Sequence, residues 1–182
     1  MSDTEKHDGL KGVIDKAQDM VGGMVGMGSA MTAGSHDSEA FVMNAGVGDL
    51  YEVHAGRIAM ERSRSDAVRN FAAMMVEHHT TSLHQMQSAL MSSEVASVLP
   101  NVKPATALDN RRQGMIEHLR DAPEDDFDMR YLDQQKMAHQ ETLQLLGGYL
   151  EHGDNPQLRS VARGARPMVE RHLKTIERIR AH

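Results

Sequence analysis

Four long segments of the sequence repeat apolar residues at intervals of three and four, which is the spacing of one face of an α-helix. These segments lie at about 41–62, 65–92, 122–152 and 155–180. The composition agrees, because only 3% of the 182 residues are aromatic, whereas helix-favouring residues such as Met, Ala, Leu and Gln are frequent. Since each helix must bury its apolar face against another element, the pattern predicts an all-α protein with a four-helix bundle at residues 39–182.

The stretch between the second and third segments is long for a helical hairpin. Residues 93–122 contain Pro100 and Pro104 and a short helical pattern at about 107–120, and Pro123 is expected near the first turn of the third bundle helix. A hairpin connection in a bundle uses roughly two to eight residues. We therefore predict a long crossover that makes the second and third helices of the bundle run parallel.

Residues 1–38 differ from the rest of the chain, because they are rich in Gly and Met and contain no aromatic residue. Apolar residues nevertheless recur there at helical spacing: Leu10, Val13, Ile14, Ala17, Val21 and Met24. The segment is predicted to be an N-terminal arm, either a flexible tail or an amphipathic helix that docks through this apolar stripe. We expect the bundle to fold without residues 1–36.

Charge and composition exclude several classes of function. The formal net charge of −6 and the mixing of acidic with basic residues argue against a nucleic-acid partner. The sequence contains no run of roughly 18 apolar residues, which a transmembrane span would need. The first residues are acidic and no apolar run follows them, so we expect no secretory signal and a cytoplasmic location. Because cysteine is absent, only His, Asp, Glu and Met remain as strong metal ligands.

Each of the four apolar stripes carries one polar side chain near its middle: Glu52, His79, His139 and His172. All four lie roughly 11 to 16 residues from the start of their helices, so their heights agree to within about 8 Å. A buried carboxylate or imidazole is costly unless it is paired or binds a metal. The four residues are therefore predicted to hold a divalent metal ion, with zinc or iron first and manganese or copper as alternatives. A hydrogen-bonded polar layer without metal is the other interpretation.

The spacing around these histidines favours a mononuclear site. Di-iron bundles use Glu-x-x-His motifs, and no histidine here has a Glu three residues before it. Met75 and Met168 each lie four residues before a predicted ligand, where thioethers would suit copper(I), although Met at this spacing is usually core packing.

The remaining histidines give weaker signals. His54 and His78 are expected outside the site or at its rim. Four others are predicted to be solvated surface residues: His84, His118, His152 and His182.

Several runs of the sequence resemble a known family in their order and spacing. They are FVMNAGVGDLYEVHAGRIAMERSRSDAVRNFAAMMVEHHTTSLHQM from residue 41, Leu99-Pro100, FDMRYL at 127–132, MAHQE around His139 and ARPMVERHL at 165–173. Together they resemble the ferritin-like family catalogued as domain of unknown function 4142. This resemblance implies a ferritin-like four-helix bundle and directs attention to the same four polar positions. The resemblance also implies that relatives often carry an export signal, and we expect this sequence to depart from them there.

The sequence thus predicts a ferritin-like metal-binding protein in metal handling or stress protection, and it defines no reaction. The alternative is a non-catalytic interaction module whose N-terminal arm docks on a membrane surface, a partner or a second copy of the chain. Metal analysis of the purified protein discriminates the two, since an interaction module should carry no stoichiometric metal.

Overall fold

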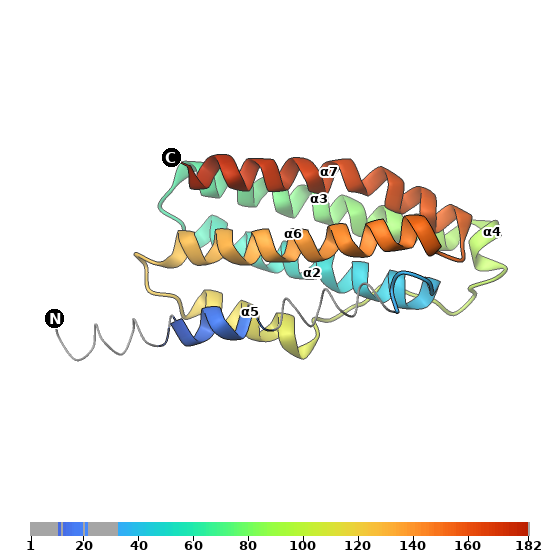
Figure 1. The fold of residues 1–182 in the computed structure, drawn as a ribbon, viewed down its shortest axis with the longest axis horizontal. Coiled ribbons are helices and arrows are strands. Elements are labelled where there is room, and N and C mark those ends of the chain that lie inside the picture. Colours follow the sequence, from blue (N-terminus) through green and yellow to red (C-terminus); the bar gives the residue numbers. More distant parts are fainter. Residues whose placement is uncertain (1–10, 12, 20, 22–32, 182) are drawn as a thin grey trace.

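The computed structural model describes residues 11, 13–19, 21 and 33–181, which contain helices and no strand (Figure 1). Four long helices form the body of the protein: α2 (Ser38–Arg62), α3 (Asp66–Met91), α6 (Phe127–His152) and α7 (Pro156–Arg180). Two shorter helices lie between α3 and α6, namely α4 (Ser93–Ala96) and α5 (Asn110–Arg120). The predicted all-α bundle is confirmed.

Three of the four long helices, α2, α3 and α7, begin at residues whose side chains accept hydrogen bonds from the first free backbone N–H groups, whereas α6 has no such cap. Asp37 accepts from the N–H of Ala40 at 2.7 Å, and Ser65 accepts from that of Val68 at 3.4 Å. Asn155 caps α7, which starts with proline in its first turn. These caps satisfy donors that have no partner within the helix, so short polar residues determine where the helices start.

The order of the helices matches the predicted crossover. Figure 1 shows α3 and α6 running in the same direction, with α2 and α7 antiparallel to them. Helix α2 packs on α3 and α6, and α7 also packs on α3 and α6. The parallel helices therefore lie diagonally across the bundle, which is the arrangement of two hairpins joined by a long connection.

Helix α5 lies within the crossover and packs on the outside of α2 and α6. Its C-terminal end is held by Arg62 of α2, whose guanidinium donates to the carbonyl oxygens of Leu119, Arg120 and Ala122 at 2.8, 2.7 and 2.7 Å. A cation at this end of a helix is favourable, because the last carbonyl groups carry partial negative charge. Arg62 thereby ties the crossover to the bundle.

The start of the third bundle helix differs from the prediction. Pro123 does not lie in the first turn of α6, which begins at Phe127. Instead, the carbonyl of Pro123 accepts from the N–H of Asp126 at 3.1 Å in a turn that precedes the helix. The proline ends the connection from α5 rather than opening the helix.

Two hydrophobic clusters fill the bundle, one toward each end. The first includes Tyr51, Met75, Leu132 and Ile176, and the second includes Val42, Met86, Leu145 and Val169. On α3, α6 and α7 the gap between the two clusters contains His79, His139 and His172, whereas on α2 it contains Asp49, and Glu52 comes directly after Tyr51 of the first cluster. The bundle core is therefore interrupted by one polar layer between two apolar regions.

Helices α2 and α3 approach closely at Gly56. A Cβ atom placed on this glycine would lie 2.8 Å from Val76 Cγ2 and 3.0 Å from the backbone oxygen of Ala72. Both distances are shorter than ordinary van der Waals contact. The absence of a side chain at Gly56 thus lets α3 pack against α2 at this height.

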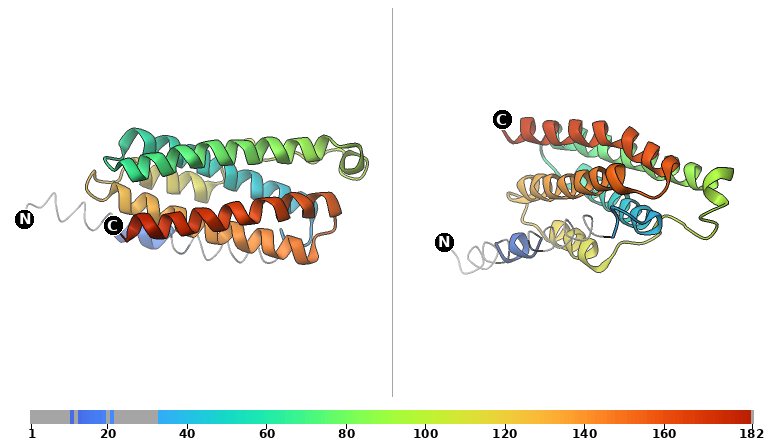
Figure 2. Two further views of the ribbon diagram at one scale, coloured as in Figure 1. Left: turned by 90° about the horizontal axis from the view of Figure 1, so that it is seen from above. Right: turned by 45° about the vertical axis from the view of Figure 1, so that its right-hand side comes forward.

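Residues 11, 13–19 and 21 of the N-terminal arm are helical and lie beside α5 (Figure 2). The acidic residues of the arm, not its apolar residues, face the bundle. Asp15 Oδ2 pairs with Arg130 at 2.9 Å, and the Asp19 carboxylate contacts His118 Nδ1 at 2.8 Å and accepts from Gln134 Nε2 at 2.6 Å.

The apolar stripe of the arm is exposed where the structure describes it. Val13, Ile14 and Val21 expose 67%, 47% and 56% of their surface. The stripe does not pack on the bundle, because the acidic residues of the same helix face it and find cationic and amide partners there. Leu10 and Met24 lie outside the described residues. Within the described part of the chain, no helix is both long and apolar enough to cross a membrane.

Candidate metal centre

Three histidines from three different helices meet inside the bundle. His79 of α3, His139 of α6 and His172 of α7 expose 3%, 1% and 1% of their surface. One ring nitrogen of each lies within 4.8 Å of the others. The ring centroids are 5.6, 5.6 and 5.1 Å apart, so the three imidazoles form a nearly equilateral triangle. This group is close enough to hold a metal ion.

Hydrogen bonds at the outer edge of two of the rings determine their tautomers. His79 Nδ1 lies 2.7 Å from Asp49 Oδ1, and His139 Nδ1 lies 2.8 Å from the backbone oxygen of Gln135. A carboxylate and a carbonyl oxygen are acceptors, so each Nδ1 carries the proton and donates it. The Nε2 atom of each ring then carries a lone pair, as metal ligation requires; that of His79 has no partner within the described residues, and that of His139 lies 3.0 Å from His172 Nδ1.

His172 connects this triangle to the surface of the bundle. Its Nδ1 lies 3.0 Å from His139 Nε2, and its Nε2 lies 2.8 Å from His78 Nδ1. The rings of His78 and His172 are stacked, with centroids 5.1 Å apart and planes inclined by 16°. His78, which is half-buried, therefore lies at the rim of the site and touches it directly, although it is one position away from the inward stripe of α3.

Glu52 lies beside the three histidines rather than among them. Its Oε1 is 3.4 Å from His139 Nδ1, the edge of the ring opposite to Nε2. The carboxylate is 3% exposed, and Oε2 has no hydrogen-bond partner within the described residues. Of the four predicted ligands, the structure places three in one group and the fourth next to it.

Burial and charge shift the pKa values of these groups in different directions. Burial, with the charge of His79 as a second cause, lowers the pKa of His139 to about 3. Burial and the neighbouring histidines lower the pKa of His172 to about 2. Both rings are therefore neutral at neutral pH and can donate a lone pair.

The other two groups shift upward. Burial raises the pKa of Glu52 to about 7. Burial alone would lower the pKa of His79, but its hydrogen bond to Asp49 and the charges of Asp49 and Glu52 outweigh that effect and raise it. Asp49, Glu52 and His79 thus form a group of ionisable side chains beside the two neutral rings.

Asp49 was not identified from the sequence as part of the site. It is 8% exposed and lies on α2, three residues before Glu52. Because residues three apart share a face of a helix, this spacing was the available signal.

Most of the remaining histidines lie where the sequence placed them. His54, His84 and His152 are exposed, and His152 stacks on His36 with ring centroids 5.0 Å apart. His118 was predicted to be a solvated surface residue, which is wrong, because it is half-buried and contacts Asp19 of the arm. His182 lies outside the described residues.

The methionines considered as copper ligands differ in their burial. Met75 is fully buried and belongs to the first hydrophobic cluster. Met168 is half-buried. Met75 thus contributes to core packing, as methionine at helical spacing usually does.

The fold and the site together define a helical-bundle protein with a buried cluster of three histidines between two hydrophobic cores. The chain belongs to the family described as a domain of unknown function (DUF4142), whose family model matches residues 25–179. No curated protein and no solved structure matches the chain.

Proposed function

We propose that this protein binds one divalent metal ion through His79, His139 and His172, with the Glu52 carboxylate completing the site. Its role is metal handling or stress protection rather than a defined turnover. The proposal extends the plain geometric finding, three buried imidazoles in mutual contact range, to a bound ion.

The observation that carries the proposal is the state of His79 Nε2. This atom is buried and has no hydrogen-bond partner within the described residues. Its ring is held from the other side by Asp49 at 2.7 Å. An imidazole that is oriented by a carboxylate while its second nitrogen is left unpaired is typical of a metal ligand, because a buried polar atom without a partner otherwise costs about 1–3 kcal/mol.

The donor set favours zinc or iron, and manganese and copper are alternatives. Neutral imidazole suits borderline divalent ions, and a carboxylate adds one negative charge. In a tetrahedral zinc site with Zn–N distances of about 2.1 Å, the ligand nitrogens would be about 3.4 Å apart. His139 Nε2 and His172 Nδ1 are already 3.0 Å apart, so a modest movement of the third ring would complete the triangle.

Glu52 is the proposed fourth ligand for two reasons. It is a buried carboxylate next to the histidines, as Asp49 is, and its Oε2 lacks a hydrogen-bond partner in the described structure. Its pKa of about 7 means that a metal ion would compete with only a weakly held proton at neutral pH. With zinc, four protein ligands make a closed site, whereas iron or manganese has room for a further ligand.

Elemental analysis of untagged protein tests the proposal most directly. We expect about one equivalent of metal in the wild type and a large loss of it in His139→Ala. His84→Ala is the matched control, because His84 is exposed and lies outside the site. A chelator should lower the melting temperature of the wild type and of the control, and have little further effect on the His139 variant.

A different set of results would refute metal binding. If the wild type contains no metal, binds none on addition of zinc, iron, manganese or copper, and melts at the same temperature with and without chelator, the histidines form a hydrogen-bonded polar layer. The histidines would then serve only to hydrogen-bond one another, from His139 through His172 to His78.

The interaction module is the second candidate, and the exposed stripe of the arm favours it. Val13, Ile14 and Val21 face away from the bundle while Asp15 and Asp19 hold the helix on it. We propose a membrane surface as the occupant, since such a stripe can insert at the lipid interface. Cosedimentation with lipid vesicles should be lost in a Val13→Ser/Ile14→Ser/Val21→Ser variant. Equal recovery of both proteins with vesicles would refute it.

A further inference from the structure

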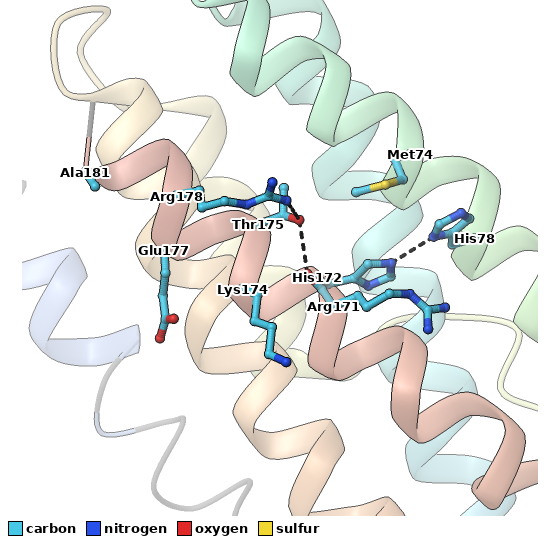
Figure 3. Close-up of a pocket in the computed structure, with 9 residues that line it drawn as sticks. All are labelled: Met74, His78, Arg171, His172, Lys174, Thr175, Glu177, Arg178 and Ala181. Carbon is cyan, nitrogen blue, oxygen red and sulfur yellow. Dashed lines mark hydrogen bonds between the residues drawn. The ribbon is translucent and has the colours of Figure 1, made fainter.

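A pocket opens at the surface of the bundle between α3 and α7, next to the histidine cluster (Figure 3). Its volume is about 670 Å³. Helix α3 contributes Met74 and His78, and α7 contributes most of the remaining wall, including His172. The pocket thus reaches from solvent to a histidine of the candidate metal centre.

The walls of the pocket are basic, although the chain as a whole has a net charge of −6. Three of its lining residues are basic (Arg171, Lys174 and Arg178), and Glu177 is the one acidic residue among them. Figure 3 shows Arg171 and Arg178 extending toward α3, whereas Lys174 and Glu177 point away from that side. Arg171 lies beside His172 and Arg178 beside Thr175, so the side of the pocket toward α3 carries two exposed guanidinium groups and no carboxylate.

These guanidinium groups are available to a ligand. Within the described residues Arg171 forms no ion pair, and Arg178 donates a hydrogen bond to the neutral hydroxyl of Thr175 at 2.8 Å. Most other arginines in contact with the bundle are held by carboxylates or carbonyl groups, such as Arg111 by Glu141 at 2.7 Å. Guanidinium groups bind carboxylate and phosphate oxygens in bidentate geometry, so each of these two groups can hold an anion that enters the pocket.

We propose that this pocket binds a small anion bearing carboxylate or phosphate oxygens, and that this anion strengthens metal binding through His78. The anion site rests on the pocket and its arginines alone. The coupling to the metal rests on the proposed function. A cation is the wrong occupant, since two guanidinium groups would repel it.

His78 is the link between the anion and the metal. For His172 to use Nδ1 as a ligand, its Nε2 must carry the proton and donate it to His78 Nδ1, 2.8 Å away. His78 then carries its own proton on Nε2. An anion that accepts this proton as a hydrogen bond favours that tautomer of His78, and with it the ligating tautomer of His172. By reciprocity, a bound metal should strengthen anion binding to the same degree.

Calorimetric titration of the full-length protein with inorganic phosphate tests the pocket. Succinate in a separate titration distinguishes phosphate from carboxylate oxygens as the preferred group. The pocket variant is Arg171→Gln/Arg178→Gln. The control is Arg159→Gln/Arg163→Gln, which removes the same charge from another part of α7. We expect the pocket variant to bind the preferred anion at least tenfold more weakly, and the control to remain within about twofold of the wild type.

Two outcomes would overturn the proposed anion site. In one, the wild type binds neither phosphate nor succinate, and in the other, both double variants bind the anion equally weakly. The first outcome means that the pocket has no anion site, and the second that only the overall charge matters. Circular dichroism of all variants checks that the bundle is folded.

A second titration separates the coupling from the pocket. Zinc affinity of the wild type should rise several-fold at saturating anion, and this gain should vanish in His78→Phe, which keeps an aromatic ring but has no nitrogen. Unchanged zinc affinity in the wild type contradicts the coupling. If the protein binds anion through its arginines but binds no metal, the proposed function fails while the pocket stands.

Discussion

Asp49 Oδ1 accepts a hydrogen bond from His79 Nδ1 at 2.7 Å, joining α2 to α3 inside the polar layer. The contact holds the ring of His79 in one orientation, and its buried Nε2 has no partner among the residues that the structure describes. Asp49 is 8% exposed, so solvent screens this interaction weakly. The Asp49 carboxylate thus orients His79 so that its Nε2 atom can bind a ligand.

Replacing Asp49 by Asn should weaken metal binding without removing a ligand. The amide has the same shape but no charge, so it makes His79 less basic and can turn its NH₂ group toward the ring. Metal affinity should fall about 10–100-fold, as for other residues that orient a metal-bound histidine. Competition with a chromophoric chelator measures the affinity.

The matched control for this variant is Asp125→Asn, because the Asp125 side chain is 97% exposed and lies away from the site. Its metal affinity should equal that of the wild type. An Asp49 variant with unchanged affinity would mean that the hydrogen bond to His79 has only a structural role.

The metal-free protein should lose stability as the pH falls below 6.5. The pKa values of His139 and His172 are lowered to about 3 and about 2 by burial, whereas the unfolded chain takes up protons at about 6.5. Protons therefore favour the unfolded state below pH 6.5. Glu52 acts in the opposite sense, since its raised pKa of about 7 lets the folded state hold a proton that the unfolded state releases above about 4.5.

His139 and His172 against Glu52 leave a net uptake of about one proton on unfolding near pH 5, or about 1.4 kcal/mol per pH unit, whereas near pH 6.5 the raised pKa of His79 adds to the opposing contribution of Glu52. In the presence of chelator the melting temperature should therefore fall by several degrees between pH 6.5 and 5. Glu52→Gln removes the opposing contribution, so its decline should be steeper. A wild-type melting temperature that is constant between pH 6.5 and 5 would contradict the neutral state of the two rings.

Gly56→Ala should destabilise the bundle by about 1–3 kcal/mol, because the new methyl group overlaps Val76 and the backbone of Ala72. Gly164→Ala is the control, since a Cβ there meets nothing within 4 Å in the described structure. That variant should gain roughly 0.5–1 kcal/mol from helix propensity. Urea denaturation measures both. Equal stability of the two variants would show that α3 can move away from α2 at little cost.

Removal of residues 1–36 should leave a bundle that unfolds cooperatively at a slightly lower temperature. The truncation removes the contacts of Asp15 with Arg130 and of Asp19 with His118 and Gln134, but no member of the two hydrophobic clusters. Thermal melts followed by circular dichroism compare the truncated and full chains. The full-length variant Asp15→Asn/Asp19→Asn should reproduce most of the shift. A melt without a cooperative transition would show that the arm is part of the folding unit.

The candidate site could be predicted from the sequence to the extent that it follows from helical spacing. Glu52, His79, His139 and His172 each interrupt an apolar stripe at a similar depth, and that pattern is visible without a structure. His78 is different, because it lies 100° around α3 from His79. Only the angle at which α7 packs on α3 brings His172 Nε2 within 2.8 Å of it.

The N-terminal arm shows the limit of the same reasoning. Its apolar stripe was the visible signal, yet Asp15 and Asp19 make the contacts. Their partners, His118, Arg130 and Gln134, lie about a hundred residues further along the chain. No local pattern connects residues so far apart, and a solvated acidic face looks the same in sequence as one that is paired with basic groups.

By itself, the sequence determined the four long helices, the crossover between the two hairpins and the face on which each central polar residue lies. These features depend on short-range physics, namely the helical repeat, the caps and the burial of apolar stripes. Only the tertiary structure decided that three imidazoles meet while Glu52 lies beside them, that Asp49 orients His79, and that a basic pocket reaches His172. Those relationships depend on the relative height and rotation of packed helices, which side-chain contacts across the whole bundle set together.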